Sequence, residues 1–254
     1  MPIQELCTIE AADSLNDFAY SFTLRAPGIT AAMAGPGQFV HIKCGEGLLL
    51  RRPISVCSWE GELLQVVFEV RGEGTQWLAR CKQGDTLDVL GPLGTGFRVA
   101  AGERVLLVGG GIGVPPMLGC ARYAGGSASA VLGFRSADRA MLLEEFRKCC
   151  KDVFPCSDDG SIGAHGFVDA QVREVLAKDK SFTAVLACGP KPMLRAVARA
   201  AAEYGVPCQV SMEERMACGV GACLGCAVQM ADGSMKHVCK DGPVFSAEEV
   251  DWNA

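Results

Sequence analysis

Four cysteines near the end of the chain have the types and spacing that most clearly imply chemistry. Cys218, Cys223, Cys226 and Cys239 are separated by four, two and twelve residues. This order, C-x4-C-x2-C…C, is the spacing of plant-type [2Fe-2S] proteins. Glycines between the first three cysteines permit the tight turns that let backbone N–H groups point at sulfur. We therefore predict that these four residues ligate a [2Fe-2S] cluster.

Two alternatives to the cluster are open from the sequence. A structural zinc site with four thiolates usually pairs two C-x2-C knuckles, and only Cys223 and Cys226 form one here. The cysteines could also be unliganded core residues, which their crowding argues against. In plant-type ferredoxins the fourth cysteine lies farther along the chain, so the spacing alone does not make this a ferredoxin domain. We expect Cys239 to return on a hairpin that turns at Asp232-Gly233.

A glycine-rich stretch in the middle of the chain predicts a nucleotide site. Gly109, Gly110, Gly111, Ile112 and Gly113 follow the apolar run 104–108 and precede a helical pattern. That context is typical of a loop whose N–H groups face a phosphate. The stretch departs from G-x-G-x-x-G, and an unliganded glycine turn is the alternative.

A second loop of the same kind closes a later apolar run, with Cys188, Gly189 and Pro190 at its end. Ligands of a doubly wound sheet sit beyond the carboxyl ends of its strands, where both loops are expected. A buried thiol at a strand end is an equally good interpretation of Cys188.

Weaker signals for a pyrophosphate lie in the first hundred residues. Arg51 and Arg52 precede Pro53, Ile54 and Ser55. Gly74 and Thr75 come just before a short helix expected over 76–81. A helix start beside an arginine would suit a pyrophosphate, although an arginine pair is usually solvated surface.

The elements that must hold these residues fall into three regions. Residues 1–100 contain short β-rich segments with turn signals, which predict an antiparallel β-barrel. Strands and helices alternate over 101–211, as in a doubly wound parallel α/β domain. Residues 212–254 are expected to form a small β-rich lobe around the four cysteines.

Composition excludes several classes of protein. The chain has 254 residues and a net charge of -5, without a cluster of Lys and Arg, so nucleic acid is not the expected partner. No signal peptide and no apolar run of about 20 residues are apparent, so we expect a cytoplasmic protein without a membrane span. The ten scattered cysteines, among the 14 in total, are interpreted as small core residues.

Several segments in order resemble the ferredoxin–NADP reductase superfamily: RRPISV, GEGTQWL, GPLGTGF, GGGIGVPPM and CGPKPML. The ending SMEERMACGVGACLGC with VCKDGPVF more specifically resembles the family of electron-transfer subunits of class 1B dihydroorotate dehydrogenases. The resemblance covers essentially the whole chain, and its C-terminal block is the most specific part.

The resemblance implies cofactors, partners and residue roles. FAD would lie on the barrel, against Arg52, Pro53, Ile54, Ser55, Val67, Phe68, Glu69, Gly74 and Thr75. NAD would dock on the loop 109–113, near 188–190, and the four cysteines would hold the [2Fe-2S] cluster. The partner would be an FMN-containing dihydroorotate dehydrogenase catalytic subunit, in a heterotetramer of two subunits of each kind that serves pyrimidine biosynthesis.

No side chain is expected to act as a catalytic base. The histidines, His41, His165 and His237, occur in no nucleophile or base motif, and hydride transfer to a flavin needs none. Two other functions are kept open. One is a subunit of another NAD(P)H-linked flavin and iron–sulfur oxidoreductase, with a ferredoxin or sulfur-compound partner. The other is a zinc-stapled binding module without redox function.

Overall fold

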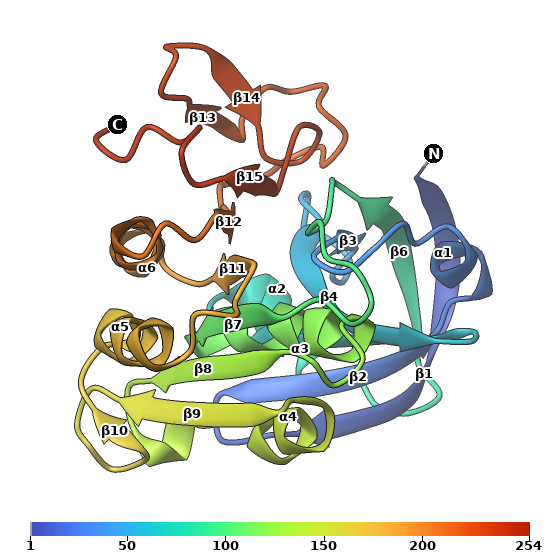
Figure 1. Cartoon of the computed structure of the whole chain (residues 1–254). Helices are drawn as coiled ribbons and strands as arrows, with labels where there is room; N and C mark the ends of the chain where they lie inside the picture. The colour runs from blue at the N-terminus through green and yellow to red at the C-terminus, as the bar shows by residue number, and fades with distance from the viewer. Residues whose placement is uncertain (1) are drawn as a thin grey trace.

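The computed structural model describes residues 2–254, and its N-terminal part is a closed six-stranded barrel (Figure 1). Every pair of neighbouring barrel strands is antiparallel, in the order β1-β2-β5-β4-β3-β6. Two short helices accompany the barrel, α1 (Pro27–Ala31) and α2 (Glu73–Leu78). The strands are β1 (Ile3–Ser14), β2 (Ala19–Arg25), β3 (Phe39–Ile42), β4 (Arg52–Glu60), β5 (Leu63–Glu69) and β6 (Thr86–Leu93).

The barrel closes around an apolar interior supplied by alternate strand positions. Phe22 and Phe68 meet edge to face inside it, with ring centroids 5.1 Å apart. Both rings are almost fully buried, and β-branched residues from β3, β4 and β5 fill the rest. The predicted antiparallel barrel is confirmed.

The second region is a seven-stranded sheet in the order β10-β9-β8-β7-β11-β12-β15. All neighbouring strands are parallel except β15, which runs antiparallel to β12. The strands are β7 (Val105–Gly110), β8 (Ser129–Phe134), β9 (Asp152–Ser157), β10 (Ala164–His165), β11 (Ala184–Cys188), β12 (Cys208–Ser211) and β15 (Val244–Ser246).

Helices cover this sheet, which confirms the predicted α/β region. The chain runs outward from β7 through β8 and β9, then returns to the other side of β7 as β11. The order therefore reverses between β7 and β11, where such sheets bind ligands. The helices are α3 (Val114–Tyr123), α4 (Leu143–Cys149), α5 (Val168–Lys178) and α6 (Lys191–Glu203), with 3-10 turns η1 (Gly111–Gly113) and η2 (Ala137–Arg139).

Two predicted helices have different bounds in the structure. The helix expected from 76 begins at Glu73, because the Thr75 hydroxyl accepts the Gly72 N–H at 3.2 Å and closes the first turn early. The sequence pattern over 139–151 also predicts one continuous helix, which is reduced to α4 because Leu142 adopts a left-handed φ of 61° that interrupts it.

The C-terminal residues form a small lobe above the sheet, drawn in red in Figure 1. It contains the hairpin of β13 (Ala227–Gln229) and β14 (Met235–His237), as predicted from Asp232-Gly233. Gly233 has the positive φ of 81° that such a turn requires. The lobe also contacts the barrel, since the Thr95 N–H donates to the Gly242 carbonyl at 2.6 Å.

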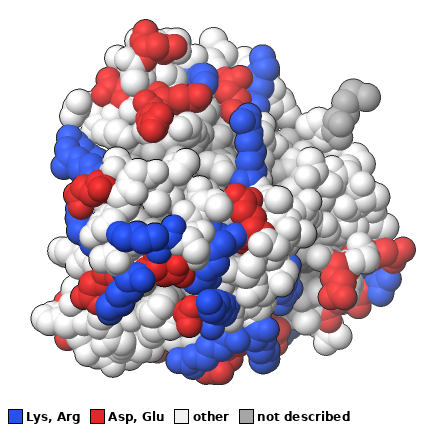
Figure 2. All heavy atoms as spheres, in the orientation of Figure 1, with Lys and Arg blue, Asp and Glu red and all other residues white. Residues whose placement is uncertain are grey.

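The barrel and the sheet pack directly against each other. Helix α3 lies so close to β4 that a Cβ added at Gly119 would be 2.8 Å from the Cys57 carbonyl oxygen. Arg122 also donates to the Ser58 hydroxyl at 2.7 Å. Acidic and basic side chains are interspersed over the face shown in Figure 2. Within residues 2–254, no helix is both long and apolar enough to cross a membrane.

Candidate functional site

The four late cysteines lie together as two pairs of sulfur atoms. Cys226 Sγ and Cys239 Sγ are 3.3 Å apart and buried, while Cys218 and Cys223 form the second, more accessible pair. Each iron of a [2Fe-2S] cluster takes two thiolates, so two pairs fit the group. Within residues 2–254, no three His, Cys, Asp or Glu side chains gather around one point in the manner of a single-ion site.

Backbone N–H groups of the cluster loop, residues 218–226, are directed at these sulfurs. The N–H groups of Val220, Ala222 and Cys223 point at Cys218 Sγ from 3.3–3.4 Å. The N–H of Gly221 reaches Cys239 Sγ at 3.1 Å. Donors of this kind stabilise thiolates and tune an iron–sulfur group, so the loop fits the predicted ligand.

The thiol pKa values reflect this arrangement. Burial opposes ionisation of Cys218, but the backbone N–H donors outweigh it and lower its pKa to about 6. In the inner pair, burial and the neighbouring Cys226 raise the pKa of Cys239 to about 12. Cys239 therefore needs a cation beside it to be held as a thiolate.

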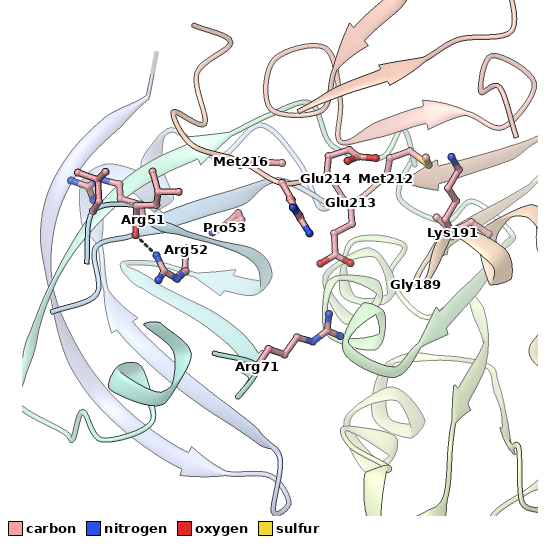
Figure 3. A pocket seen from close by; sticks show the side chains of 14 residues that line it. Arg51, Arg52, Pro53, Arg71, Gly189, Lys191, Met212, Glu213, Glu214 and Met216 are labelled. Atoms are coloured by element: carbon pink, nitrogen blue, oxygen red, sulfur yellow. Dashed lines mark hydrogen bonds between the residues drawn. The ribbon is translucent and has the colours of Figure 1, made fainter. Parts of the chain in front are cut away.

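A cleft of about 860 Å³ opens between the barrel, the start of α6 and the segment 212–216 (Figure 3). Its size is that of a cofactor pocket. Arg52 and Pro53 line the barrel side and Gly189 lines the sheet side. The structure thus brings the predicted flavin residues of β4 to the same cavity as the second glycine loop.

Arg52 lies against the first turn of α2, beside the predicted Gly74 and Thr75. A Cβ added at Gly74 would be 2.2 Å from Arg52 Nε, so the glycine lets the guanidinium lie this close to the helix. Arg52 also donates to the Leu50 carbonyl, the dashed line in Figure 3. A guanidinium at a helix start suits an anion. The Thr75 hydroxyl is engaged in the cap, where it accepts the Arg71 N–H at 2.8 Å.

The other predicted flavin residues do not line this cleft. The Ile54 and Phe68 side chains are buried in the barrel core, and Val67 is buried where the barrel meets the sheet. These residues could offer a ligand only backbone groups. Ser55 lies on β4 opposite Phe39, and Glu69 pairs with Arg71 at 3.1 Å.

The two predicted glycine loops touch at the reversal of the sheet. Gly109 of β7 pairs with Cys188 of β11, and a Cβ at Gly113 would be 2.2 Å from the Cys188 carbonyl oxygen. A Cβ at Gly110 would be 2.2 Å from Met193 Sδ. These contacts explain the glycines of the loop 109–113 without a ligand, and they leave Gly111 facing open space. Burial raises the pKa of Cys188 to about 12, so its thiol stays protonated.

Comparison with known protein families and relatives shows which proteins of this fold the chain resembles. Residues 213–251 match the model for the iron–sulfur cluster binding domain of dihydroorotate dehydrogenase B, and residues 107–199 match that for an oxidoreductase NAD-binding domain. The dihydroorotate dehydrogenase B (NAD(+)) electron transfer subunit of Caldanaerobacter subterraneus is 43% identical, over 85% of this chain and 86% of the relative. The same subunit of Bacillus velezensis is 40% identical, over 96% and 97%.

The chain belongs to the family of dihydroorotate dehydrogenase B electron transfer subunits. The same subunit of Enterococcus faecalis is 40% identical over 97% of this chain and 98% of the relative, so the likeness spans barrel, sheet and lobe together.

Solved structures extend the likeness beyond dihydroorotate dehydrogenase B. An NADH-dependent reduced ferredoxin-NADP oxidoreductase, studied for flavin-based electron bifurcation, has a TM-score of 0.88 at 33% identity and covers 98% of this chain and 91% of its own. The ferredoxin reductase of carbazole 1,9a-dioxygenase, at 23% identity and a TM-score of 0.69, shares the fold over 81% of this chain and 67% of its own. These neighbours confirm the predicted resemblance to ferredoxin reductases.

Several residues that line the cleft were not predicted as site residues from the sequence. Figure 3 shows the Glu213 carboxylate and the Arg71 guanidinium directed into the cavity from opposite sides, with Lys191 at its edge. The sequence offered some signal, because Arg71 immediately precedes the segment GEGTQWL and Lys191 follows Cys188-Gly189-Pro190. Glu213 had no signal beyond its place before the cluster loop.

Proposed function

We propose that this protein passes electrons between NAD(H) and an FMN-containing dihydroorotate dehydrogenase catalytic subunit, by way of bound FAD and a [2Fe-2S] cluster. The observation that carries the proposal is the set of four thiols in two pairs, ringed by backbone N–H groups of the cluster loop. Such a site serves one-electron transfer rather than substrate chemistry. Family membership supports the partner and the role in pyrimidine biosynthesis.

The proposed function requires three binding sites, for FAD, for NAD and for the [2Fe-2S] cluster. Bound FAD would supply the chemistry that connects a two-electron hydride donor, NADH, to a one-electron iron–sulfur cluster. Cys218 and Cys223 would hold one iron, and Cys226 and Cys239 the other. Arg52, over the first turn of α2, would neutralise the flavin pyrophosphate.

The remaining predicted contacts complete the nucleotide sites. The backbones of Ile54, Ser55 and 67–69, with Gly74 and Thr75, would frame FAD, and the loops 109–113 and 188–190 would frame NAD. These loops meet at the reversal of the sheet, where ligands of such sheets bind. The cleft joins the β4 residues to the second loop, so both nucleotides would approach one space.

We further propose three units, residues 1–100 for FAD, 101–211 for NAD and 212–254 for the cluster, and a cytoplasmic heterotetramer of two subunits of each kind. Co-expression with the catalytic subunit, followed by light scattering of the purified complex, tests the stoichiometry. A complex with another number of subunits would overturn that part alone.

The electron-transfer function is tested on the anaerobically purified full chain. We expect one FAD and two irons per chain, and NADH should bleach the flavin and produce a [2Fe-2S] EPR signal. With the catalytic subunit added, dihydroorotate should reduce NAD. A colourless protein that holds one zinc and no iron would contradict the proposal and favour the zinc-stapled module.

The variant Gly113→Ala tests the NAD loop separately. Its Cβ would press on the Cys188 carbonyl oxygen, so we expect at least about tenfold slower flavin reduction by NADH, with dithionite reduction unchanged. Gly125→Ala is the control, since Gly125 has a positive φ of 65° but nothing within 4 Å. Equal rates in both variants would remove the loop from NAD binding.

A second candidate function comes from the 33% identity with the reduced ferredoxin-NADP oxidoreductase over nearly the whole chain. In that case the electrons would pass to a ferredoxin or a related redox partner. Affinity purification from the native cell distinguishes the two, because an FMN-containing catalytic subunit supports the first function and a ferredoxin or sulfur enzyme supports the second.

A further inference from the structure

One fully buried polar side chain lies between the barrel and the cluster loop. His41, on β3, has no exposed surface. Within residues 2–254, neither of its ring nitrogens has a hydrogen-bond partner. An unsatisfied buried polar group costs about 1–3 kcal/mol, and its presence asks for a specific reason. The position of the ring supplies one.

His41 points out of the barrel and toward the C-terminal lobe. Along β3, Val40 and Ile42 pack in the barrel core, and Phe39 packs in the core that includes Val238 and the cysteines Cys226 and Cys239. Since alternate residues of a strand face opposite sides, His41 shares the side of Phe39. The two rings confirm this, with centroids 5.8 Å apart.

The His41 ring contacts the residue that follows the first cluster cysteine. A Cβ built on Gly219 would lie 2.7 Å from His41 Cε1 and 2.8 Å from Nδ1. Gly219 also has a positive φ of 72°, so glycine is required there twice over. The Nδ1–Cε1 edge of the imidazole therefore faces the cluster loop directly beside Cys218.

The same histidine neighbours the proposed flavin strand. His41 pairs with Pro53 of β4, one residue from Arg52, and the Arg51 guanidinium reaches the His41 carbonyl oxygen at 3.4 Å. A single residue, His41, thus connects the proposed flavin strand β4 to the cluster loop.

The chemistry of the ring suits a sulfur acceptor. Burial, with the nearby Arg51 cation, lowers the pKa of His41 to about 4, so the ring is neutral and carries one N–H donor. Thiolate and sulfide sulfurs only accept hydrogen bonds. Donors to sulfur raise the reduction potential of an iron–sulfur cluster, because they stabilise the extra negative charge of the reduced state.

We propose that the imidazole N–H of His41 donates a hydrogen bond to a cluster sulfur and thereby raises the cluster's reduction potential. The inference rests on the proposed function, since it requires a [2Fe-2S] group at the four cysteines. It explains why the His41 ring nitrogens are buried without a hydrogen-bond partner among residues 2–254. Its role is distinct from ligation, because the four thiols complete both irons.

The test compares two substitutions in the full chain loaded with FAD and cluster. H41F keeps a flat ring and removes the N–H, while H41Q keeps an N–H donor. Phe39→Leu is the matched control, because it alters the neighbouring ring on the same side of β3 without touching a donor. Iron and FAD per chain are measured first, and an EPR-monitored redox titration follows.

We expect H41F to lower the reduced-to-oxidised ratio of the cluster about tenfold at a fixed potential, which is 59 mV for one electron. Its EPR g values should change, while the FAD potential stays that of the wild type. H41Q and Phe39→Leu should both remain near the wild-type ratio. Loss of iron from H41F but not from H41Q would also support the donor.

The opposite results are equally clear. A wild-type potential and EPR spectrum in H41F would overturn the inference, and so would iron loss from both His41 variants with FAD retained, since shape rather than the N–H would then matter. If the unaltered protein itself shows no [2Fe-2S] signal, the proposed function fails instead.

Discussion

The buried cysteines of the barrel and sheet and the cysteines of the cluster loop have the same side chain in opposite environments. Burial raises the pKa of Cys7, Cys57 and Cys208 to about 12. Cys218 has a pKa of about 6, because backbone N–H donors overcome its partial burial. Residue type therefore does not decide whether a thiol here is an inert core group or a metal ligand.

The difference lies in the backbone around each sulfur. In the strands and helices, N–H groups are used by the ladders and turns, so the buried thiols of Cys7 and Cys44 point at carbonyl oxygens, 3.8 and 3.5 Å away, and receive no N–H donor from residues 2–254. In the cluster loop, the chain curls so that successive N–H groups converge on Cys218 Sγ. Glycines at positive φ make that curl possible, at Gly219 and Gly221.

Removal of one loop thiol should give the largest effect. We expect Cys226→Ala to leave more than about tenfold less iron per chain than the wild type, because Cys239 would lose its pair. Cys208→Ala is the control, since Cys208 is also buried but lies on β12, outside the cluster loop. Iron analysis and EPR measure both. Equal iron content in the two variants would contradict the assignment of Cys226 as a cluster ligand and Cys208 as a core residue.

A glycine substitution should give the next largest effect. Gly219→Ala strains a left-handed backbone and drives a Cβ into the His41 ring, so we expect several-fold less cluster after reconstitution. Gly205→Ala has nearly the same φ, 68° against 72°, with nothing within 4 Å of its Cβ. It should lose only about 1 kcal/mol of unfolding free energy and keep its iron. Iron per chain and urea unfolding distinguish strain from collision.

Structural elements that depend on a short stretch of the chain could be predicted from the sequence. The Asp232-Gly233 hairpin, a helix over 168–178 and a strand over 184–188 all follow from local sequence patterns, and the structure contains each of these elements. Strands β1 and β2 were missed as elements, because β1 mixes exposed polar and buried residues over twelve positions without clean alternation.

Features made by distant segments could not be predicted. The cleft joins Arg71 and Lys191, which lie 120 residues apart, and His41 meets Gly219 only because the lobe folds back onto the barrel. Strand β15 likewise joins the parallel sheet from beyond the cluster loop, antiparallel to β12. Such contacts depend on tertiary packing, which no local spacing encodes.

The reactivity of the thiols should show a moderate effect. In cluster-free protein, the thiolate fraction of Cys218 rises from about one tenth at pH 5 to about nine tenths at pH 7, because its lowered pKa of about 6 lies between them. We expect alkylation by iodoacetamide to accelerate accordingly and then level off above pH 7. Peptide mass spectrometry should find Cys208 unlabelled throughout. A Cys218 rate that keeps rising to pH 9 would mean an ordinary thiol.

Substitution of a buried cysteine should give the smallest effect. Cys120 lies fully buried in α3, and burial raises its pKa, so its sulfur serves only to fill space. We expect Cys120→Ala to lower the unfolding free energy by about 1 kcal/mol, as for the loss of one buried heavy atom. Iron content and the rate of flavin reduction by NADH should be unchanged, because Cys120 contributes no donor or charge to either site. A fall in iron content or in the rate of flavin reduction, without a larger loss of stability, would show that buried cysteines take part in electron transfer. The contrast between core cysteines and cluster cysteines would then be wrong.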